Sequence, residues 1–316
     1  MCHISDDMIR IPFRREGFAK EMKPKISGAN LSLEYDNIES SLMKTGADLA
    51  NILPQPLIDR LVNNYLAGNP PEPDATATDY LQRAMLHFAL YEHLIFIITR
   101  ISNDGVTIKK NDDETTAFKY QTDELRNKLI TTAWFWMNLL IRFLNDHLAD
   151  FPEWDGSPQK LAFDELPVDL ADFNRWVGVQ LAGGEFFILC VGWIIREVWL
   201  DCVCSRFEKP VKTDAIARAV CYDVMGRAIE RLAYSALPEP IRIDIDNEMG
   251  KNHRAQADRF IKENVAKSFI HKAQTYWNAV DLDIKRTEMA AMRKTAGDRP
   301  VIGENHHRDN DKFCFV

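Results

Sequence analysis

The sequence predicts a mainly α-helical fold made of a duplicated helical-bundle unit, with an extended arm at each terminus. In each copy a helix, a second helix, a small β-hairpin and a long helix follow one another. Residues 78–84, Thr-Asp-Tyr-Leu-Gln-Arg-Ala, recur as Thr-Asp-Ala-Ile-Ala-Arg-Ala at 213–219, an offset of 135 residues that also aligns Gln121 with Gln256. A fixed period of this kind is the sequence signature of a repeated structural unit.

Apolar residues correspond at the same offset without a gap. The pairs are Leu94 with Ile229, Ile97 with Leu232, Val106 with Ile241, and Ile108 with Ile243. Chance could produce the few identities, but the constant offset and the kept apolar character favour duplication. Duplicated helical units more often build surfaces and assemblies than a single catalytic cleft.

Composition restricts the class of protein. The chain has 316 residues, of which 46% are hydrophobic and 27% charged, as in an ordinary soluble globular protein. Its formal net charge of −8 argues against tight non-specific nucleic-acid binding, although DNA could still pass the surface. Several of the six cysteines, such as Cys190 and Cys202, lie in apolar stretches and are expected to be buried free thiols.

No secretory signal and no membrane span are expected. Residues 1–7 contain no continuous apolar run. The longest apolar stretch, 186–203, is interrupted by Arg196, Glu197 and Asp201, which favours a buried core helix.

In the first half, an arm (1–30) precedes a unit that spans 31–155. Helices are expected from Tyr35 to Ile52 and over 57–66, after which Pro and Gly residues form a loop. Thr78 or Asp79 can cap the next helix, which extends to about Ile101. This helix is apolar on most sides and is therefore expected to be buried by other elements.

A small β-hairpin with a charged tip is expected next. Residues 106–109, Val-Thr-Ile-Lys, alternate as a short strand, 111–114 form the turn and 115–118 return as the second strand. A long helix then spans roughly 120–148.

The second half repeats this order, after a boundary loop at 151–158, as a unit that spans 156–295. We expect a helix over 171–206 broken near Gly183, a helix after Thr213, an alternating strand at 241–245 and a closing helix over 254–292. A polar C-terminal tail (296–316) ends in Phe313-Cys314-Phe315-Val316. This apolar segment can add to a sheet edge, its own or a neighbour's, or remain disordered.

A search for catalytic motifs leaves no catalytic, cofactor-binding or metal-binding residue to predict. There is no P-loop, GxGxxG, HExxH or GxSxG sequence. Ser41 and Lys44 fit an SxxK pattern that chance readily produces. Cys202 and Cys204 lack the further ligands of a closed zinc site, and on so apolar a helix His87 is more often a hydrogen-bonded core residue than a ligand.

The predicted working parts are therefore contact surfaces on the two hairpins and the terminal segment. The candidate interaction residues are Val106, Ile108, Asp112, Asp113, Glu114, Ile241, Ile243, Phe313, Phe315 and Val316.

The order of these elements resembles the head–tail connector proteins of tailed bacteriophages, also called adaptor or head-completion proteins. It is still more similar to a family of uncharacterised phage and prophage proteins of gut bacteria. The resemblance rests on residues 81–148, 169–202 and the closing Lys312-Phe313-Cys314-Phe315-Val316. It depends on pattern and carries over no catalytic residue. The doubled unit departs from the simplest adaptors, which have one helical bundle.

The resemblance implies a non-enzymatic structural protein of the virion, assembled in the bacterial cytoplasm. Such adaptors form a homo-oligomeric ring, twelve-fold in the family, between the portal protein and tail or further connector proteins. An acidic subunit suits a ring through which DNA passes without specific binding. The alternative is an intracellular helical enzyme or regulator with its site between the two halves, in a polar pocket that holds His87, His93 or the Cys202–Cys204 pair. A third interpretation is a plain helical adaptor of the host.

Overall fold

The computed structural model describes residues 11–26, 34–68, 70–102, 105–108, 119–178, 184–251 and 257–297. The protein is mainly helical, which confirms the predicted fold class at that level. Its elements are α1 (Phe18–Met22), η1 (Lys23–Lys25), α2 (Tyr35–Ala50), α3 (Gln55–Ala67), α4 (Asp74–Ile98), β1 (Thr99–Ser102), β2 (Gly105–Ile108), α5 (Lys119–Asp146), α6 (Pro152–Asp155), α7 (Pro158–Asp164), α8 (Leu170–Trp176), α9 (Glu185–Val198), the π-helix η2 (Trp199–Cys204), α10 (Asp214–Arg231), η3 (Tyr234–Ala236), α11 (Glu239–Lys251) and α12 (Ala257–Gly297).

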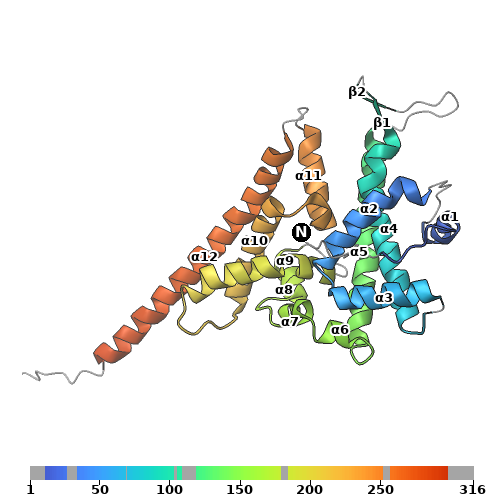
Figure 1. Ribbon diagram of the computed structural model, residues 1–316. Coiled ribbons are helices and arrows are strands. Elements are labelled where there is room, and N and C mark those ends of the chain that lie inside the picture. Colours follow the sequence, from blue (N-terminus) through green and yellow to red (C-terminus); the bar gives the residue numbers. More distant parts are fainter. Residues whose placement is uncertain are drawn as a thin grey trace, which may run out of the picture.

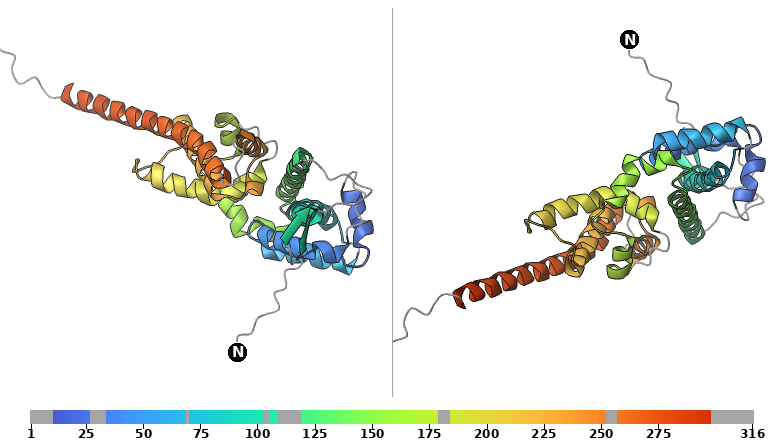
Figure 2. Two further views of the ribbon diagram at one scale, coloured as in Figure 1. Left: turned by 90° about the horizontal axis from the view of Figure 1, so that it is seen from above. Right: turned by 90° about the horizontal axis from the view of Figure 1, so that it is seen from below.

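Two lobes are visible in Figure 1. One contains α1 to α6 and the hairpin, and the other contains α8 to α12. The lobes meet where α5 lies against α9. The C-terminal part of α12 continues beyond the second lobe and points away from the first, as Figures 1 and 2 show. The molecule is therefore elongated.

Trp134 of α5 lies at the centre of the contact between the lobes. Its ring centroid is 5.1 Å from that of Phe186, and its indole N–H donates to the Ser235 carbonyl at 2.8 Å. Arg242 of α11, only 1% exposed, donates to Thr131 Oγ1 at 2.8 Å. Buried rings and buried hydrogen bonds of this kind hold the lobes in one relative orientation.

Residues 11–26 belong to the core of the first lobe, so the expected extended arm is wrong for this segment. Phe13 and Phe18 are buried, with their ring centroids 5.9 Å apart, and Phe18 also contacts Tyr35 of α2. Tyr65 of α3 donates its hydroxyl hydrogen to Glu21. Apolar residues that are scattered in sequence converge here because a turn and two short helices bring them to one side.

Helix α4 begins one turn earlier than predicted, at Asp74 rather than after Thr78 or Asp79. The Asp74 side chain is buried in the first turn and accepts hydrogen bonds from Arg60 at 2.7 and 3.0 Å and from Asn64. An acidic group is favourable near a helix N-terminus, and here partners from α3 neutralise it.

The hairpin lies earlier in the sequence than predicted, because the predicted first strand is its second strand. β1 pairs antiparallel with β2 so that Thr99 faces Ile108 and Ser102 faces Gly105. Val106 and Ile108 thus lie in a strand, but their partner is the segment predicted to end the preceding helix. The predicted return strand, 115–118, lies outside the described residues. Backbone at Thr99 is already extended, and β-branched residues such as Thr99 and Ile101 favour strand over helix.

The second predicted strand, 241–245, is wrong, because these residues form the first turns of α11. Ile241 and Ile245 are buried, whereas Ile243 is 47% exposed. Residues four apart lie on one face of a helix, so five alternating residues satisfy a helical pattern as well as a strand. Pro240, in the first turn, suits a helix start.

The predicted boundary loop at 151–158 is also packed structure. It contains α6 and leads into α7, and both Phe151 and Trp154 are fully buried. The Trp154 indole donates to Asn145 at 2.9 Å, which fixes the end of α5 against this turn.

The predicted repeat aligns the helices of the two halves, but the segments that connect these helices differ in structure. The offset places α4 on α10 and α5 on the start of α12, and α4 packs on α5 as α10 packs on α12. Between them the first half has a β-hairpin and the second half has η3 and α11. The duplication therefore stays a prediction that concerns the helix pairs.

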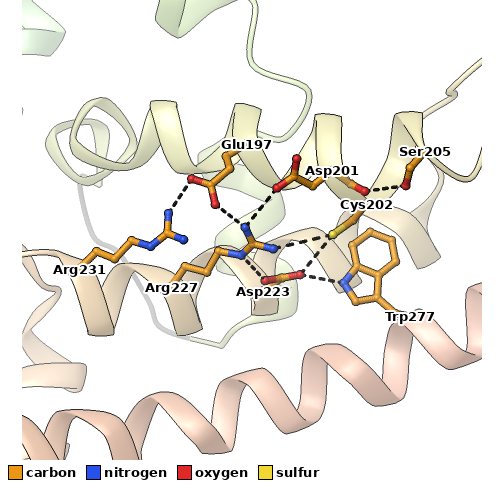
Figure 3. A network of polar contacts seen from close by, with 8 residues as sticks. All are labelled: Glu197, Asp201, Cys202, Ser205, Asp223, Arg227, Arg231 and Trp277. Atoms are coloured by element: carbon orange, nitrogen blue, oxygen red, sulfur yellow. Dashed lines mark hydrogen bonds and ion pairs between the residues drawn. The ribbon is translucent and has the colours of Figure 1, made fainter.

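A network of charges ties α9, η2, α10 and α12 together (Figure 3). The Arg227 guanidinium binds Asp223 at 2.8 Å and also Glu197, which accepts from Arg231 at 2.6 Å. Trp277 of α12 donates to Asp223 at 3.0 Å. Burial opposes the charge on Arg227, yet its carboxylate partners raise the pKa of Arg227 above the usual value.

Candidate interaction groove

An apolar groove of about 530 Å³ runs between α4 and α5. Its walls are two stripes at helical spacing, one from each helix. It is lined by Lys25, Ile26, Arg83, His87, Leu90, Leu94, Ile97, Leu125, Lys128, Leu129, Thr132, Phe135 and Trp136.

Positive charge is placed at two points along this groove. Lys25 and Arg83 both bind Asp79, at 2.5 and 2.7 Å, and the Arg83 guanidinium lies over the Trp136 ring at 4.6 Å. Burial raises the pKa of Asp79, but the hydrogen bonds from Lys25 and Arg83 outweigh it and hold that pKa below its usual value. Among the described residues, Lys128 is therefore the groove cation without a carboxylate partner.

His87 is a buried histidine of the groove wall, as the apolar character of its helix predicts. Its Nδ1 lies 2.7 Å from the Arg83 backbone carbonyl, so Nδ1 carries the hydrogen and donates it. Burial lowers the pKa of His87 below 6.5, and the imidazole is neutral at pH 7.

His87 is expected to reduce stability in mild acid. A histidine whose folded pKa is depressed gives stability above the unfolded pKa of about 6.5, and this stability is lost as the pH falls toward the folded value. Urea denaturation of the wild-type protein and of His87→Leu at several pH values from 7.5 to 5 measures the effect. The wild-type midpoint should fall more steeply than that of the variant. Equal slopes would contradict the assignment.

The outer wall of the groove and the adjacent end of α4 carry large apolar side chains in contact with solvent. Ile95 is 54% exposed, Phe96 49% and Phe135 55%. Ile97 and Leu125 belong to the same set. We call these five residues the α4–α5 apolar face, of which Ile97, Leu125 and Phe135 line the groove, while Ile95 and Phe96 belong to the last turn of α4 beside it. Helix α4, which the sequence predicts to be buried, is thus buried over most of its length but exposed at its C-terminal end.

Only some of the predicted interaction residues lie near the α4–α5 apolar face. Val106 and Ile108 lie in β2, in the hairpin that continues α4 beyond the face. Ile241 is buried inside the second lobe, and Ile243 is exposed on α11. The remaining candidates, Asp112, Asp113, Glu114, Phe313, Phe315 and Val316, lie outside the described residues.

The groove itself was not predicted from sequence. Its signal is present as two stripes, Arg83-His87-Leu90-Leu94-Ile97 and Leu125-Leu129-Thr132-Trp136, which read as ordinary core. Periodicity shows which residues share a face, but it does not show whether the chain itself covers that face.

The cysteine and histidine candidates do not assemble into a metal centre in the described part of the chain. There, no group of three or more His, Cys, Asp or Glu residues could hold a metal ion. Cys202 Sγ lies 3.7 Å from Asp223, and burial raises the pKa of that thiol. Within the described ranges, no helix combines the length and apolar character needed to cross a membrane.

Comparison with protein families gives a match over part of the chain. Residues 49–163 match a family described as a family of unknown function, DUF6712. No curated protein and no solved structure gives a significant match. The matched segment includes the whole of α4 and α5, and therefore both walls of the groove, but not Lys25 and Ile26.

Proposed function

We propose that this protein is a structural subunit of a phage head–tail connector, which assembles as a homo-oligomeric ring between the portal protein and the tail. The observation that carries the proposal is the α4–α5 apolar face. Large apolar side chains that stay exposed in and beside one groove mark surfaces for protein contacts. The resemblance in element order supports this class of assembly.

The shape of α12 supports the same proposal. In its C-terminal part, Leu282, Met289 and Met292 lie on one side of the helix and are all more than half exposed. Helices in proteins gain most of their stability from packing of an apolar face. A neighbouring subunit or connector protein would supply that packing.

The charge of the chain supports the passage of DNA. A formal net charge of −8 provides no broad positive surface on which DNA would be held. The subunits would line or surround a channel without specific DNA contacts.

We also propose that the pairs α4–α5 and α10–α12 are two copies of one ancestral helix pair. The shared offset of 135 residues supports this origin. The connecting segments differ, with a hairpin in one and a helix in the other, so the two copies would contact different partners.

Assembly can be tested directly on the purified protein, alone and mixed with a phage portal protein. We expect ring-shaped particles by negative-stain electron microscopy. Replacing both Phe96 and Phe135 by serine should abolish them, because it removes the aromatic residues of the face. Leu161→Ser is the matched control, since Leu161 is equally exposed (51%) but lies on α7. Protein that stays monomeric at its highest soluble concentration and never binds portal particles would refute the proposal.

A second candidate function rests on His87. A groove of about 530 Å³ has the size of a small-molecule site, and His87 lines it, as the alternative of a helical enzyme or regulator requires. The groove lies within the first lobe and not between the halves, and its walls are mainly apolar. Thermal stabilisation by a metabolite, lost in His87→Leu without loss of fold, would favour this candidate.

A further inference from the structure

We propose that the segment Phe313–Val316 of one copy binds in the groove between α4 and α5 of a second copy. This inference deepens the proposed ring assembly and rests on it. It assigns an occupant to the groove and a target to the apolar end of the tail.

The chemistry of the segment fits the groove. The groove presents leucines and two aromatic side chains, Phe135 and Trp136. Phe313 and Phe315 are two residues apart, so an extended segment places both rings on one side, roughly 7 Å apart. Aromatic pairs add stability beyond the area that they bury. The tail would thus supply apolar side chains to cover the exposed apolar wall of the groove.

Opposite charges on the tail and on the groove also favour binding of the tail in the groove. Asp309 and Asp311 precede the apolar segment, and Lys312 stands between Asp311 and Phe313. Lys128 lines the groove and has no carboxylate partner among the described residues. Asp311 and Phe313 are about 7 Å apart in an extended chain, and Lys128 and Thr132 are one helical turn, about 6 Å, apart. A segment whose carboxylate meets Lys128 therefore places its first ring beside Thr132 and Phe135.

Residues 1–10 are the weaker candidate for this position. They contain no Phe, Tyr or Trp, and they lead directly into Ile11, which is buried in the first lobe.

The direction of α12 favours a second copy over the tail's own groove. α12 ends at Gly297 on the side of the second lobe away from α4 and α5 (Figures 1 and 2). Residues 298–312 can span at most about 54 Å when fully extended. To reach its own groove, the tail would have to run back along the projecting part of α12 and then around the second lobe. A second copy placed beyond the end of α12 would present its groove within reach of the tail.

The contact also has the right symmetry for a ring. A tail in a groove joins two different surfaces of identical chains, which is a heterologous contact. Such contacts close into rings or continue as filaments.

Cys314 allows the contact to be trapped. In a Thr132→Cys variant, a short bismaleimide should join Cys314 of one chain to the thiol introduced in the groove of another, giving linked dimers and larger species on a denaturing gel. Thr132→Cys combined with Cys314→Ser is the control for the other thiols, and Leu161→Cys is the control for an exposed site outside the groove. Absence of any Cys314-dependent product would overturn the proposal. A product that is only intramolecular would overturn the assignment to a second copy.

Binding of a tail peptide to two variants tests the contact without a cross-link. One variant carries Phe313→Ser and Phe315→Ser, and the other carries Lys128→Glu and Phe135→Ser. A peptide of residues 305–316 should bind the first variant, as measured by fluorescence anisotropy, and should bind the second at least tenfold more weakly. Equal binding to both, or no binding to the first, would refute the groove as the target.

The two proposals can fail separately. If the tail variant still forms rings of wild-type size, tail docking is refuted while the connector proposal stands. If the trapped species are dimers alone and no ring is seen with or without portal protein, the contact stands as an exchanged dimer and the ring proposal fails.

Discussion

Replacing Arg227 by alanine is expected to lower the free energy of unfolding by about 2 kcal/mol, because it leaves the largely covered Asp223 carboxylate without its counter-charge. The Asp223 side chain is only 14% exposed and keeps one other strong donor, the Trp277 indole. Glu197 retains Arg231 and loses Arg227. Urea denaturation followed by circular dichroism at pH 7 measures the change.

Arg286→Ala is the matched control for this prediction. Arg286 also pairs with an aspartate on a helix, but both partners of that pair are more than 60% exposed. Exposed pairs contribute at most about 1 kcal/mol. A loss for Arg227→Ala no larger than that for Arg286→Ala would show that the network in Figure 3 adds little stability.

Replacing Gly226 by alanine is expected to destabilise the protein by about 1–3 kcal/mol, because an added methyl group overfills the contact between α10 and α12. A Cβ at Gly226 would lie 2.6 Å from Ile270 Cγ1 and 3.3 Å from the Ile270 backbone nitrogen. The clash therefore involves the base of the side chain and the backbone, and rotation of Ile270 relieves it only in part. The urea midpoint measures the loss.

Gly192→Ala should act in the opposite direction. Gly192 is also helical, but a Cβ there meets only Leu166 side-chain atoms at 3.7 Å or more. Alanine is favoured over glycine in a helix interior by about 1 kcal/mol, so this variant should be neutral or more stable. The double variant Gly226→Ala with Ile270→Ala should recover part of the loss. No destabilisation by Gly226→Ala would show that the spacing of α10 and α12 does not depend on Gly226.

Local sequence predicted the helices and several of their ends. Thr213 is the N-cap of α10, and its hydroxyl accepts the Ile216 amide hydrogen at 3.3 Å, as its position before an apolar run indicates. α5 and α12 begin within a few residues of their predicted starts. These features depend on side chains next to one another in sequence, which explains why they could be predicted.

Residues 11–26 and 241–245 were predicted wrongly for a different reason. Their local patterns are compatible with more than one structure, and contacts with distant residues select among these. Arg242 donates to Thr131 of α5, and Phe18 packs against Tyr35 of α2. A single sequence does not show such partners.

The same limit applies to the candidate site. The sequence identified the hairpin strand that contains Val106 and Ile108 and the apolar segment that begins at Phe313. It did not identify the groove, because whether Phe135 and Ile95 are covered depends on how many helices pack around α4 and α5.

The sequence by itself determined that this protein is mainly helical, where most helices lie, and which residues form their apolar stripes. Helical periodicity and capping are local properties, so they can be read along the chain. Only the tertiary structure decided which stripes become core and which remain exposed. It placed Ile241 inside, left Phe96 and Leu282 in solvent, and made a groove from α4 and α5. Burial depends on the other elements that arrive at a face, and these come from distant parts of the chain.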